Sequence, residues 1–484
     1  MAKVVVLGGG IAGHTATSFL RKWLGPEHEV TVVSPKPTYN WFPSNIWVGV
    51  GLMREDQVVF PLEPVYTHHG ISFLQARATA IYPEGSGVLP RPHVAIESTL
   101  PQTAGNIEMV PYDFLINATG PKLNFAATEG LGPGKHSVSV CTADHAVEAA
   151  SVFLEQVERM KRGERRRFVV GTGHGSCTCE GAAFEYIVNL EFELRRHGVR
   201  DKADVTYLSN EYELGDFGMG GAHIRRGGYI TPTNIFTESI FAERGIDWIT
   251  RAHVVKLETG RLDYETLSGD EKQLEFDMAM LLPPFSGVGL KAFDLLGEDI
   301  TARLFAPSGF MKVDADYDPK PYDAWRASDW PRTYQSPAYT NIFAAGIAFA
   351  PPHAISEPHF SPKGHPIFAA PPRTGMPSAM IGKVVAHSIA DLIQGKTRSL
   401  HTASMAELGA ACVASAGADL LHGTAAAMTV YPIVPDYQRF PEYGRDLSYT
   451  TGEIGLAGHW IKLALHHMFL YKAKMLPGWP LIPE

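Results

Sequence analysis

A glycine-rich turn near the start of the chain, Gly8 to Gly13, restricts the possible folds more than any other feature of the sequence. It follows the apolar run 3–8 and precedes an apolar-periodic segment, after which 30–33 is a second β-branched run. In this order of strand, turn, helix and strand, the glycine spacing indicates dinucleotide binding, because a pyrophosphate can then approach the helix N-terminus. We therefore predict an α/β fold with a dinucleotide held at Gly8, Gly10 and Gly13. The alternative is a tight turn that only packs against a helix.

Two apolar strands far apart in the sequence also end in small residues, at 113–121 and at 341–346. Small residues at strand ends separated by long insertions predict one sheet assembled from distant segments, as in two-domain flavoproteins. Ser34 closes the second strand, where most such folds place a carboxylate for the ribose hydroxyls. The expected division is 1–145 and 301–400 for the first domain, 146–300 for the second, and 401–484 for a C-terminal region.

A second glycine-rich turn, from Gly171 to Cys179, follows the apolar strand that begins at Arg167. A helix over 180–196 and a strand over 205–209 are expected to follow it. This turn carries Cys177 and Cys179, and the following strand ends in Ser209-Asn210 without a carboxylate in place for a ribose. The sequence thus predicts a nucleotide-binding-like domain that does not use NAD(P)H.

Length and charge exclude several other classes of protein. The 484 residues fit two or three domains, and the net charge of −9 argues against a nucleic-acid partner. The four cysteines include no Cys-x-x-Cys pair, so neither a metal site nor a disulfide scaffold is expected. No apolar stretch is long enough to span a bilayer, and because a strand is expected to begin at Lys3, no secretion signal is expected. Cys412 lies in an alanine-rich stretch and is interpreted as an inert core residue.

The segment 459–475 is expected to form a helix. Trp460 and Tyr471 are amphipathic rings, and Lys462, Lys472 and Lys474 supply positive charge, a mixture that suits an interfacial helix on an anionic membrane. The alternative is a final helix packed against the protein. The apolar residues 476–483 that follow favour the membrane.

At this point several motifs resemble those of a known family. They are 30–49 with its Pro43-Ser44-Asn45 turn, 140–145, 179–185, 346–352 and 371–375. Together they resemble the sulfide:quinone oxidoreductases of the flavin disulfide reductase superfamily, which are related to flavocytochrome c sulfide dehydrogenase. The resemblance runs from residue 1 to the last helix. It implies an α/β fold of two Rossmann-like domains and a C-terminal membrane-associating helical region.

The resemblance also implies an FAD site. FAD is held covalently through a sulfur of Cys141 or without such a bond, and Arg373 stands where a lysine is common and stabilises the anionic reduced flavin. The implied FAD-binding residues are Gly8, Gly10, Gly13, Ser34, Ser44, Asn45, Ala78, Ala118, Thr119, Gly120, Cys141, Gly346, Ile347, Arg373, Thr374 and Gly375.

The implied catalytic residues are Cys179, which carries the sulfide-derived sulfur, Cys177, Cys141, and Glu185 and His145, which handle protons. Two departures from the family pattern stand out. Asp216 occupies the place of a family histidine, and the segment 348–374 lacks the third cysteine that partners the Cys179 position in many members.

Three alternatives follow from the missing cysteine. Cys177 cycles with Cys179, although residues two apart make a strained bridge that a longer sulfur chain relaxes. Alternatively, Cys141 is the partner and FAD is not covalently bound, or Cys179 works alone through a flavin adduct. A cysteine at a helix N-terminus is activated as a thiolate, which fits Cys177 and Cys179, while Glu180 and Glu185 oppose that activation.

The expected function is sulfide oxidation to sulfane sulfur or polysulfide through a cysteine persulfide and FAD, with two electrons passing to a membrane quinone. The quinone would approach between Pro351-Pro352, Phe360, Pro432 and the last helix. The alternatives are a type II NADH:quinone oxidoreductase, a soluble flavocytochrome-type sulfide dehydrogenase, and a flavin-bearing protein without enzymatic activity. We expect a peripheral membrane protein on an unassigned side of the membrane, and a homo-oligomer.

Overall fold

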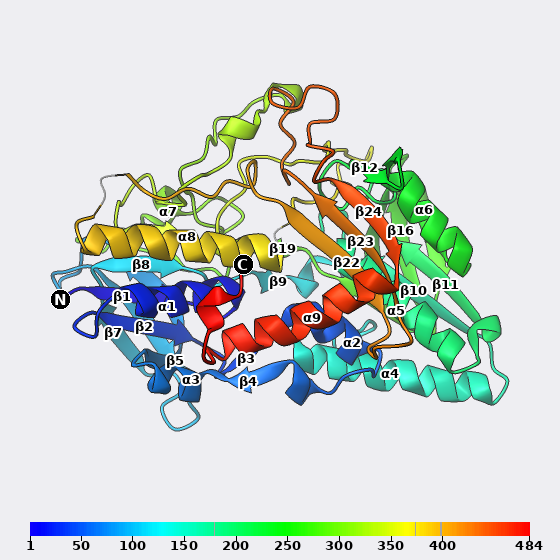
Figure 1. The fold of residues 1–484 in the computed structure, drawn as a ribbon, viewed down its shortest axis with the longest axis horizontal. Helices are drawn as coiled ribbons and strands as arrows, with labels where there is room; N and C mark the ends of the chain where they lie inside the picture. The colour runs from blue at the N-terminus through cyan, green and yellow to red at the C-terminus, as the bar shows by residue number, and fades with distance from the viewer. Residues whose placement is uncertain (179, 373, 397–398) are drawn as a thin grey trace.

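The computed structural model describes residues 1–178, 180–372, 374–396 and 399–484. The first sheet unites strands from both ends of the chain in the order β21-β8-β1-β2-β5-β6-β7, with β20 beside β5 (Figure 1). All pairs from β21 to β5 are parallel, and β5, β6 and β7 pair antiparallel. The strands are β1 (Lys3–Leu7), β2 (Glu29–Ser34), β5 (Ser72–Tyr82), β6 (His93–Ser98), β7 (Ile107–Pro111), β8 (Phe114–Asn117), β20 (Lys291–Ala292) and β21 (Ile342–Ala344).

Two helices pack closely against each other beside this sheet, α1 (Ile11–Trp23) and α8 (Gly375–Ile393). A Cβ placed on Gly382 would lie 2.3 Å from the carbonyl oxygen of Ala12, so only glycine permits this contact. The predicted assembly of one sheet from segments near residues 5, 115 and 343 is therefore present, because β1, β8 and β21 are direct neighbours.

The second parallel sheet has the order β14-β11-β10-β18. Its strands are β10 (Arg166–Thr172), β11 (Ala203–Leu208), β14 (Asp247–Ile249) and β18 (Met278–Leu282). The accompanying elements are α4 (Ala143–Lys161), α5 (Glu180–Arg196), α6 (Thr233–Arg244), and the antiparallel strands β15 (Ala252–Glu258), β16 (Arg261–Thr266) and β17 (Glu271–Glu275). A mixed sheet with a parallel centre and a second, parallel sheet, each with helices packed against it, confirm the predicted α/β fold class.

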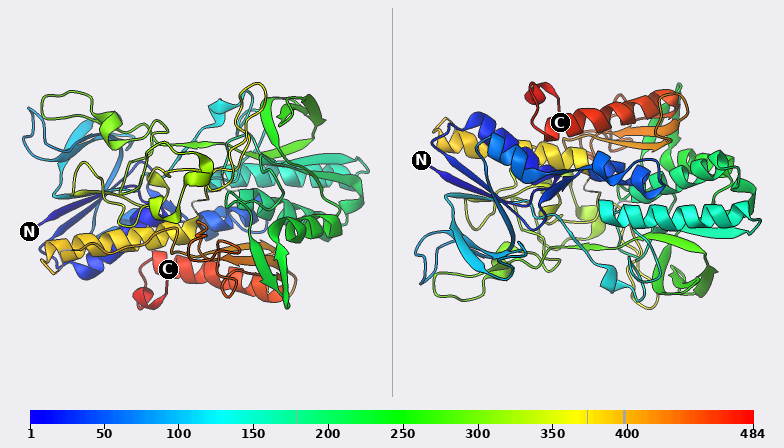
Figure 2. Two further views of the ribbon diagram at one scale, coloured as in Figure 1. Left: turned by 90° about the horizontal axis from the view of Figure 1, so that it is seen from above. Right: turned by 90° about the horizontal axis from the view of Figure 1, so that it is seen from below.

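The C-terminal region is not only helical, which corrects the sequence expectation. Three strands, β22 (Ala410–Ala416), β23 (Thr424–Val430) and β24 (Thr451–Gly455), join β12 (His223–Arg226) and β13 (Tyr229–Pro232) in a five-stranded sheet. Helix α9 (Leu456–Ala473) lies on β22 and β23, and Figure 2 shows the helix and these strands together on one side of the molecule. A Cβ on Gly458 would meet Ala425 and Ala427 at 3.1–3.2 Å, so small residues allow the close approach.

The remaining α-helices and strands of the described chain are short. They are β3 (Thr38–Asn40), α2 (Asn45–Gly49), β4 (Val59–Pro61), α3 (Leu62–His68), β9 (Lys122–Leu123), β19 (Phe285–Ser286) and α7 (Thr301–Leu304). The proposed domain division remains a prediction. Among the residues that the structure describes, no helix combines the length and the apolar character needed to cross a bilayer.

Candidate active site

One cavity of about 980 Å³ collects residues from segments that are far apart in the sequence. It extends from the first glycine turn, past the start of α4 and α5, to β22, β23 and α9. Twelve of the predicted site residues line it: Gly8, Gly10, Ser34, Ala118, Thr119, Gly120, Cys141, His145, Glu185, Ile347, Thr374 and Gly375.

The glycine turn has the geometry that a bound dinucleotide requires. Gly8 has φ +108°, and a Cβ there would lie 2.2 Å from the carbonyl oxygen of Ala118. A Cβ on Gly10, by contrast, meets no described atom within 4 Å, so this residue borders open space. Helix α1 begins at the next residue, and the free N–H groups of its first turn face an anion favourably. The residues present therefore fit the pyrophosphate of FAD.

Two of the predicted glycines act behind the cavity wall and do not line it. A Cβ on Gly13 would lie 2.0 Å from the carbonyl oxygen of Gly8, so Gly13 lets α1 pack against the turn. Gly346, at φ +62°, stands against Ala12, whose Cβ would be 2.6 Å from an added methyl group. Ala78 also lies outside the wall, within β5, where it pairs with Ile96 of β6.

Ser44 and Asn45 are buried positioning residues outside the lining. Ser44 Oγ lies 2.8 Å from Nδ1 of His466 on α9. The Asn45 side-chain amide donates to the carbonyl oxygen of Val140 at 3.2 Å, which holds the backbone directly before Cys141.

Cys141 faces the cavity just ahead of α4, and His145 lies in the first turn of that helix. The backbone N–H of Cys141 donates to Ser139 Oγ at 3.1 Å. Burial raises the pKa of the Cys141 thiol to about 11, so the free thiol is protonated at neutral pH. Burial also lowers the pKa of His145, against the opposing effect of Asp144. The buried Nδ1 of His145 has no hydrogen-bond partner among the described residues.

Glu185 forms a buried ion pair with Lys462 of α9 at 3.1 Å, and both side chains are at least 88% buried. Burial raises the pKa of Glu185, and Lys462 partly opposes the shift. The N–H of Ser415 on β22 also donates to this carboxylate, at 3.4 Å. The pair thus joins α5, β22 and α9 at the cavity wall. It also corrects the expectation that Lys462 faces a membrane surface.

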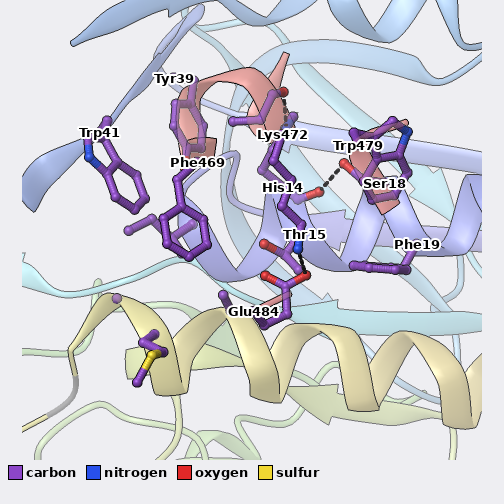
Figure 3. A pocket seen from close by; sticks show the side chains of 15 residues that line it. His14, Thr15, Ser18, Phe19, Tyr39, Trp41, Phe469, Lys472, Trp479 and Glu484 are labelled. Atoms are coloured by element: carbon purple, nitrogen blue, oxygen red, sulfur yellow. Dashed lines mark hydrogen bonds and ion pairs between the residues drawn. The ribbon is translucent and has the colours of Figure 1, made fainter. Parts of the chain in front are cut away.

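A smaller pocket of about 50 Å³ lies where the end of α9 meets α1 (Figure 3). His14 Nε2 lies 2.7 Å from the carbonyl oxygen of Ala473, and burial lowers the pKa of His14 to about 4. Lys472 pairs with the Glu484 side chain at 2.6 Å, and both are buried. Lys472 is therefore a second lysine that does not face outward, and the contact of His14 with Ala473 fastens the end of α9 to α1.

Cys177 is fully buried and does not line the cavity. Its thiol donates to the carbonyl oxygen of Leu282 at 3.1 Å, and burial raises its pKa well above the usual range. Cys179 and Arg373 lie outside the described residues, so their predicted roles remain predictions.

The second glycine turn is occupied by the chain itself. The N–H groups of Phe368 and Ala370 donate to the carbonyls of Gly175 and Cys177 at 2.9 and 2.8 Å. A Cβ on Gly175 would lie 1.9 Å from the carbonyl oxygen of Pro366, and the Gly175 N–H donates to His253 Nδ1 at 2.9 Å. The segment 366–370 thus fills the side of the turn that a nucleotide would approach.

A carboxylate does follow the strand after this turn, which the sequence analysis missed, but it points inward. Glu211 is fully buried and accepts from Ser209 Oγ at 2.7 Å and from the Phe217 N–H at 2.9 Å. Burial raises the pKa of Glu211 to about 7. Because both carboxylate oxygens accept hydrogen bonds inside the protein, Glu211 is poorly placed to bind the hydroxyl groups of a ribose.

Cys412 was interpreted as an inert core residue, yet it lines the cavity from β22. Its Sγ would lie 3.4 Å from a Cβ placed on Gly181, in the first turn of α5. Only the pairing of β22 with β23 and the packing of α5 against β22 bring this residue to the site, so no local signal marks it.

The residues expected beside the quinone approach do not line this cavity, and that approach remains a prediction. Pro351, Pro352, Phe360 and Pro432 are not among the cavity-lining residues. The apolar end of the cavity is instead built from the C-terminal sheet and α9. The residues concerned are Val413, Met428, Val430, Ile433, Leu465 and Phe469.

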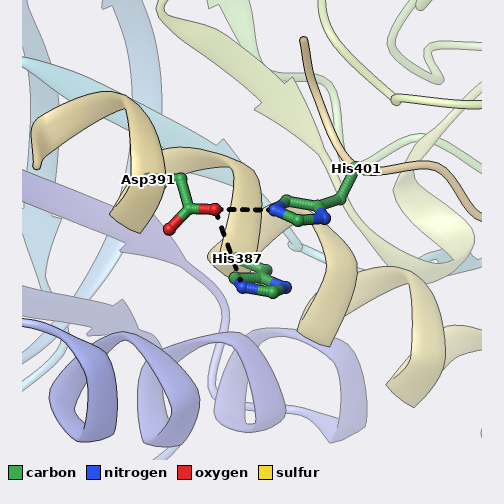
Figure 4. A group of neighbouring side chains, drawn as sticks. All are labelled: His387, Asp391 and His401. Carbon is green, nitrogen blue, oxygen red and sulfur yellow. Dashed lines mark hydrogen bonds and ion pairs between the residues drawn. The ribbon is translucent and has the colours of Figure 1, made fainter. Parts of the chain in front are cut away.

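One group of potential metal ligands lies away from the cavity, at the end of α8 (Figure 4). Asp391 Oδ2 is 2.8 Å from His401 Nε2 and 3.7 Å from His387 Nε2. The two imidazole rings stack 3.7 Å apart at an interplanar angle of 6°, so their lone pairs do not converge on one point. The arrangement ties the segment after α8 back to that helix.

Comparisons with known proteins agree with this architecture. Residues 2–215 match the family model for pyridine nucleotide-disulphide oxidoreductases. The sulfide-quinone reductase of Aquifex aeolicus is 28% identical over 475 residues, covering 98% of this chain and 92% of that protein. The mitochondrial sulfide:quinone oxidoreductase of Dictyostelium discoideum is 23% identical over 354 residues, covering 72% of this chain and 65% of that protein.

Solved structures give the same result. The X-ray structure of the Aquifex aeolicus sulfide:quinone oxidoreductase has a TM-score of 0.75 at 26% identity, covering 98% of this chain and 92% of that one. The structure of NDH2 from Plasmodium falciparum has a TM-score of 0.60 at 13% identity, which shows a shared fold alone. The resemblance that the sequence motifs indicated is therefore confirmed along nearly the whole chain.

Proposed function

We propose that this protein, a flavin-dependent oxidoreductase of the sulfide:quinone oxidoreductase type, oxidises sulfide to sulfane sulfur and passes two electrons to a membrane quinone. One observation carries the proposal. A single cavity joins a dinucleotide-binding turn, a thiol at Cys141, the Glu185–Lys462 pair and an apolar end next to α9.

Several cavity residues would hold FAD. The pyrophosphate would lie at Gly8 and Gly10 before α1, and Ser34 would accept a hydrogen bond from the ribose. Thr374 and Gly375, at the start of α8, line the cavity where the flavin is expected. FAD supplies a ring that accepts an electron pair and gives it up again. A covalent bond between FAD and the sulfur of Cys141 remains a prediction.

The protein's own residues would handle sulfur and protons. Cys179 directly precedes α5 in the sequence, and its thiolate is the form that reacts with sulfur. Burial raises the pKa of Glu185, which favours proton uptake by this carboxylate, while Lys462 compensates its charge when it is ionised. Burial lowers the pKa of His145, which lines the cavity, and its buried Nδ1 has no hydrogen-bond partner among the described residues.

NADH is disfavoured as the electron donor. The segment 366–370 covers the second glycine turn, whose Gly175 N–H is already bonded to His253. Glu211 makes hydrogen bonds inside the protein. A nicotinamide nucleotide would therefore meet segment 366–370 at this turn and would find the Gly175 N–H and the Glu211 carboxylate already bonded within the protein.

The outer face of α9 fits the surface of a membrane that holds the quinone. Trp460 and Ile461 are about half exposed, and Leu481 in the terminal segment is 88% exposed. Leu420 and Leu421 add apolar surface beside α9, since the Trp460 indole donates to the Leu420 carbonyl at 2.8 Å. The sequence analysis missed these two leucines. An apolar surface next to the apolar end of the cavity suits a lipophilic acceptor. The homo-oligomer remains a prediction.

Anaerobic flavin absorbance of the purified protein tests the proposal. Sulfide should bleach the flavin band, and decylubiquinone should restore it, while NADH should leave it unchanged. Bleaching by NADH with no response to sulfide would refute the proposal and indicate a nicotinamide site despite the covered turn.

A further inference from the structure

We infer that Cys412 is the redox partner of Cys179, taking the place of the cysteine that segment 348–374 lacks. This inference rests on the proposed function. In the oxidised protein the two sulfurs would form a bridge, directly or through sulfide-derived sulfur, at the wall of the cavity.

The position of Cys412 supports the pairing. It projects from β22 into the cavity, and its Sγ would lie 3.4 Å from a Cβ on Gly181. Gly181 is only two residues beyond Cys179 in the sequence, and β22 packs along α5. A disulfide needs Cα atoms roughly 4.4–6.8 Å apart, and an inserted sulfur atom widens that range. Cys412 thus contacts the first turn of α5, the helix that Cys179 directly precedes in the sequence.

Cys177 is the weaker candidate. It is fully buried, it lies outside the cavity wall, and its thiol is bonded to the carbonyl oxygen of Leu282. Its backbone carbonyl is also fixed by the Ala370 N–H at 2.8 Å. A bridge from Cys177 to a residue two positions away would have to break these contacts and strain the ring.

The surroundings of Cys412 favour a bridge over two free thiolates. Burial raises the pKa of Cys412 to about 11, and Glu185 adds to this shift while Lys462 opposes it. Because burial penalises a charged sulfur, a neutral sulfur bridge is the favoured resting form. Lys462, which holds Glu185 at 3.1 Å, is also the cation that would stabilise a thiolate released during the reaction.

The reaction balances with one hydrosulfide ion. Hydrosulfide attacks the Cys412 sulfur and breaks its bond to Cys179, giving a Cys412 persulfide and a Cys179 thiolate. Closure of Cys179–S–S–S–Cys412 then releases two electrons and one proton. The electron pair goes to the flavin that the proposed function supplies, and Glu185 or water takes the proton. The net change is insertion of one sulfur atom into the bridge, oxidised by two electrons.

Peptide mapping of the unaltered protein gives a test that does not depend on activity. The protein is exposed to sulfide and decylubiquinone, and its free thiols are alkylated without reduction before digestion and mass spectrometry. We expect a peptide containing Cys179 joined to one containing Cys412, with one or more additional sulfur atoms of 32 Da each. A bridge from Cys179 to Cys177 or to Cys141, with Cys412 alkylated in every sample, would overturn the inference.

Variants separate this inference from the proposed function. Cys412→Ser should slow flavin reduction by sulfide at least about tenfold and abolish the linked peptide, whereas Thr429→Ser on the neighbouring strand β23 should leave both close to wild type. Cys412→Ala serves as a second substitution if the serine variant folds poorly. If sulfide reduces the wild type and both Cys412 variants equally fast, only the inference fails. If sulfide does not reduce the wild type at all, the proposed function fails as well.

Discussion

The buried pair between Glu185 and Lys462 makes a sharp prediction for Lys462→Met. At 3.1 Å and an effective dielectric constant of about 20, the two charges attract each other by roughly 5 kcal/mol, most of which offsets their burial. Without the lysine, the buried carboxylate takes up a proton, because burial already raises its pKa. In the unfolded chain this glutamate is ionised at pH 7, so folding must include the free energy of protonating it. That cost is about 1.4 kcal/mol for each pH unit above the unfolded glutamate pKa of about 4.3. The expected loss in free energy of unfolding is therefore at most about 3.5 kcal/mol, because burial already raises the pKa of Glu185 in the wild type.

The pH dependence gives the sign of the effect. A carboxyl group whose folded pKa is raised keeps its full stability below the unfolded pKa and loses it as the pH rises toward the folded pKa. The deficit of the variant should therefore shrink from at most about 3.5 kcal/mol at pH 7 to at most about 1 kcal/mol at pH 5. Urea titration followed by tryptophan fluorescence measures it. The double variant Lys462→Met/Glu185→Gln should lie within about 1 kcal/mol of wild type at both pH values.

Lys135→Met is the matched control, since this exposed lysine should change stability by no more than about 0.5 kcal/mol. A deficit that is the same at pH 5 and pH 7, or a double variant as unstable as the single one, would refute the reasoning that a buried ion pair is broken.

Three further predictions concern the turn, a buried acid and the surface of α9. Gly10→Ala should fold normally but lose flavin on purification, because its methyl group enters open cavity space. Gly13→Ala should also lower the melting temperature, since its Cβ would lie 2.0 Å from the carbonyl oxygen of Gly8. Flavin absorbance per protein separates the two effects, and full flavin occupancy in Gly10→Ala would contradict the placement. Glu211 has its folded pKa raised to about 7, so it costs stability increasingly from about pH 4.5 to pH 7. In urea titrations, the free energy of unfolding of Glu211→Gln should thus rise by about 3 kcal/mol relative to wild type between about pH 4.5 and pH 7. If the free energies of unfolding of variant and wild type change with pH in parallel, Glu211 is ionised at no such cost. Ile461→Glu and Leu481→Glu should each reduce sedimentation with anionic lipid vesicles severalfold, while Leu296→Glu, an equally exposed leucine in another loop, should not. Unchanged sedimentation of both variants would remove α9 from the membrane surface.

The parts of the fold that follow from local sequence were predictable. The glycine spacing at residues 8–13 and the apolar strands around it depend on neighbours within one turn. The helix after the second glycine turn, Glu180–Arg196, has the bounds that the periodicity predicts. The sheet assembled from residues near 5, 115 and 343 was also predictable, because each strand ends in small residues.

The C-terminal region shows what the sequence could not reveal. The alanines of β22 and β23 have no strong strand propensity. They form strands because the two segments pair with each other and α9 packs on them. The position of Cys412 follows from that pairing, and so does the contact of Lys462 with Glu185, which are 277 residues apart. A lysine on an amphipathic helix has the same pattern whether it faces lipid or a buried carboxylate.

The segment at 366–370 that covers the second glycine turn has a consequence for protein engineering. Its backbone is bonded to the turn on both sides, through Gly175 and Cys177, and Asn210 adds a third tie to the Phe368 carbonyl at 3.0 Å. Substituting single side chains in the turn would leave this backbone in place. Converting the protein to a pyridine nucleotide donor would therefore require rerouting a whole loop, which also leads directly into the residues at the start of α8 that border the flavin cavity. Under the proposed function, the path of the main chain would thus restrict the choice of electron donor more strongly than any single side chain of the turn.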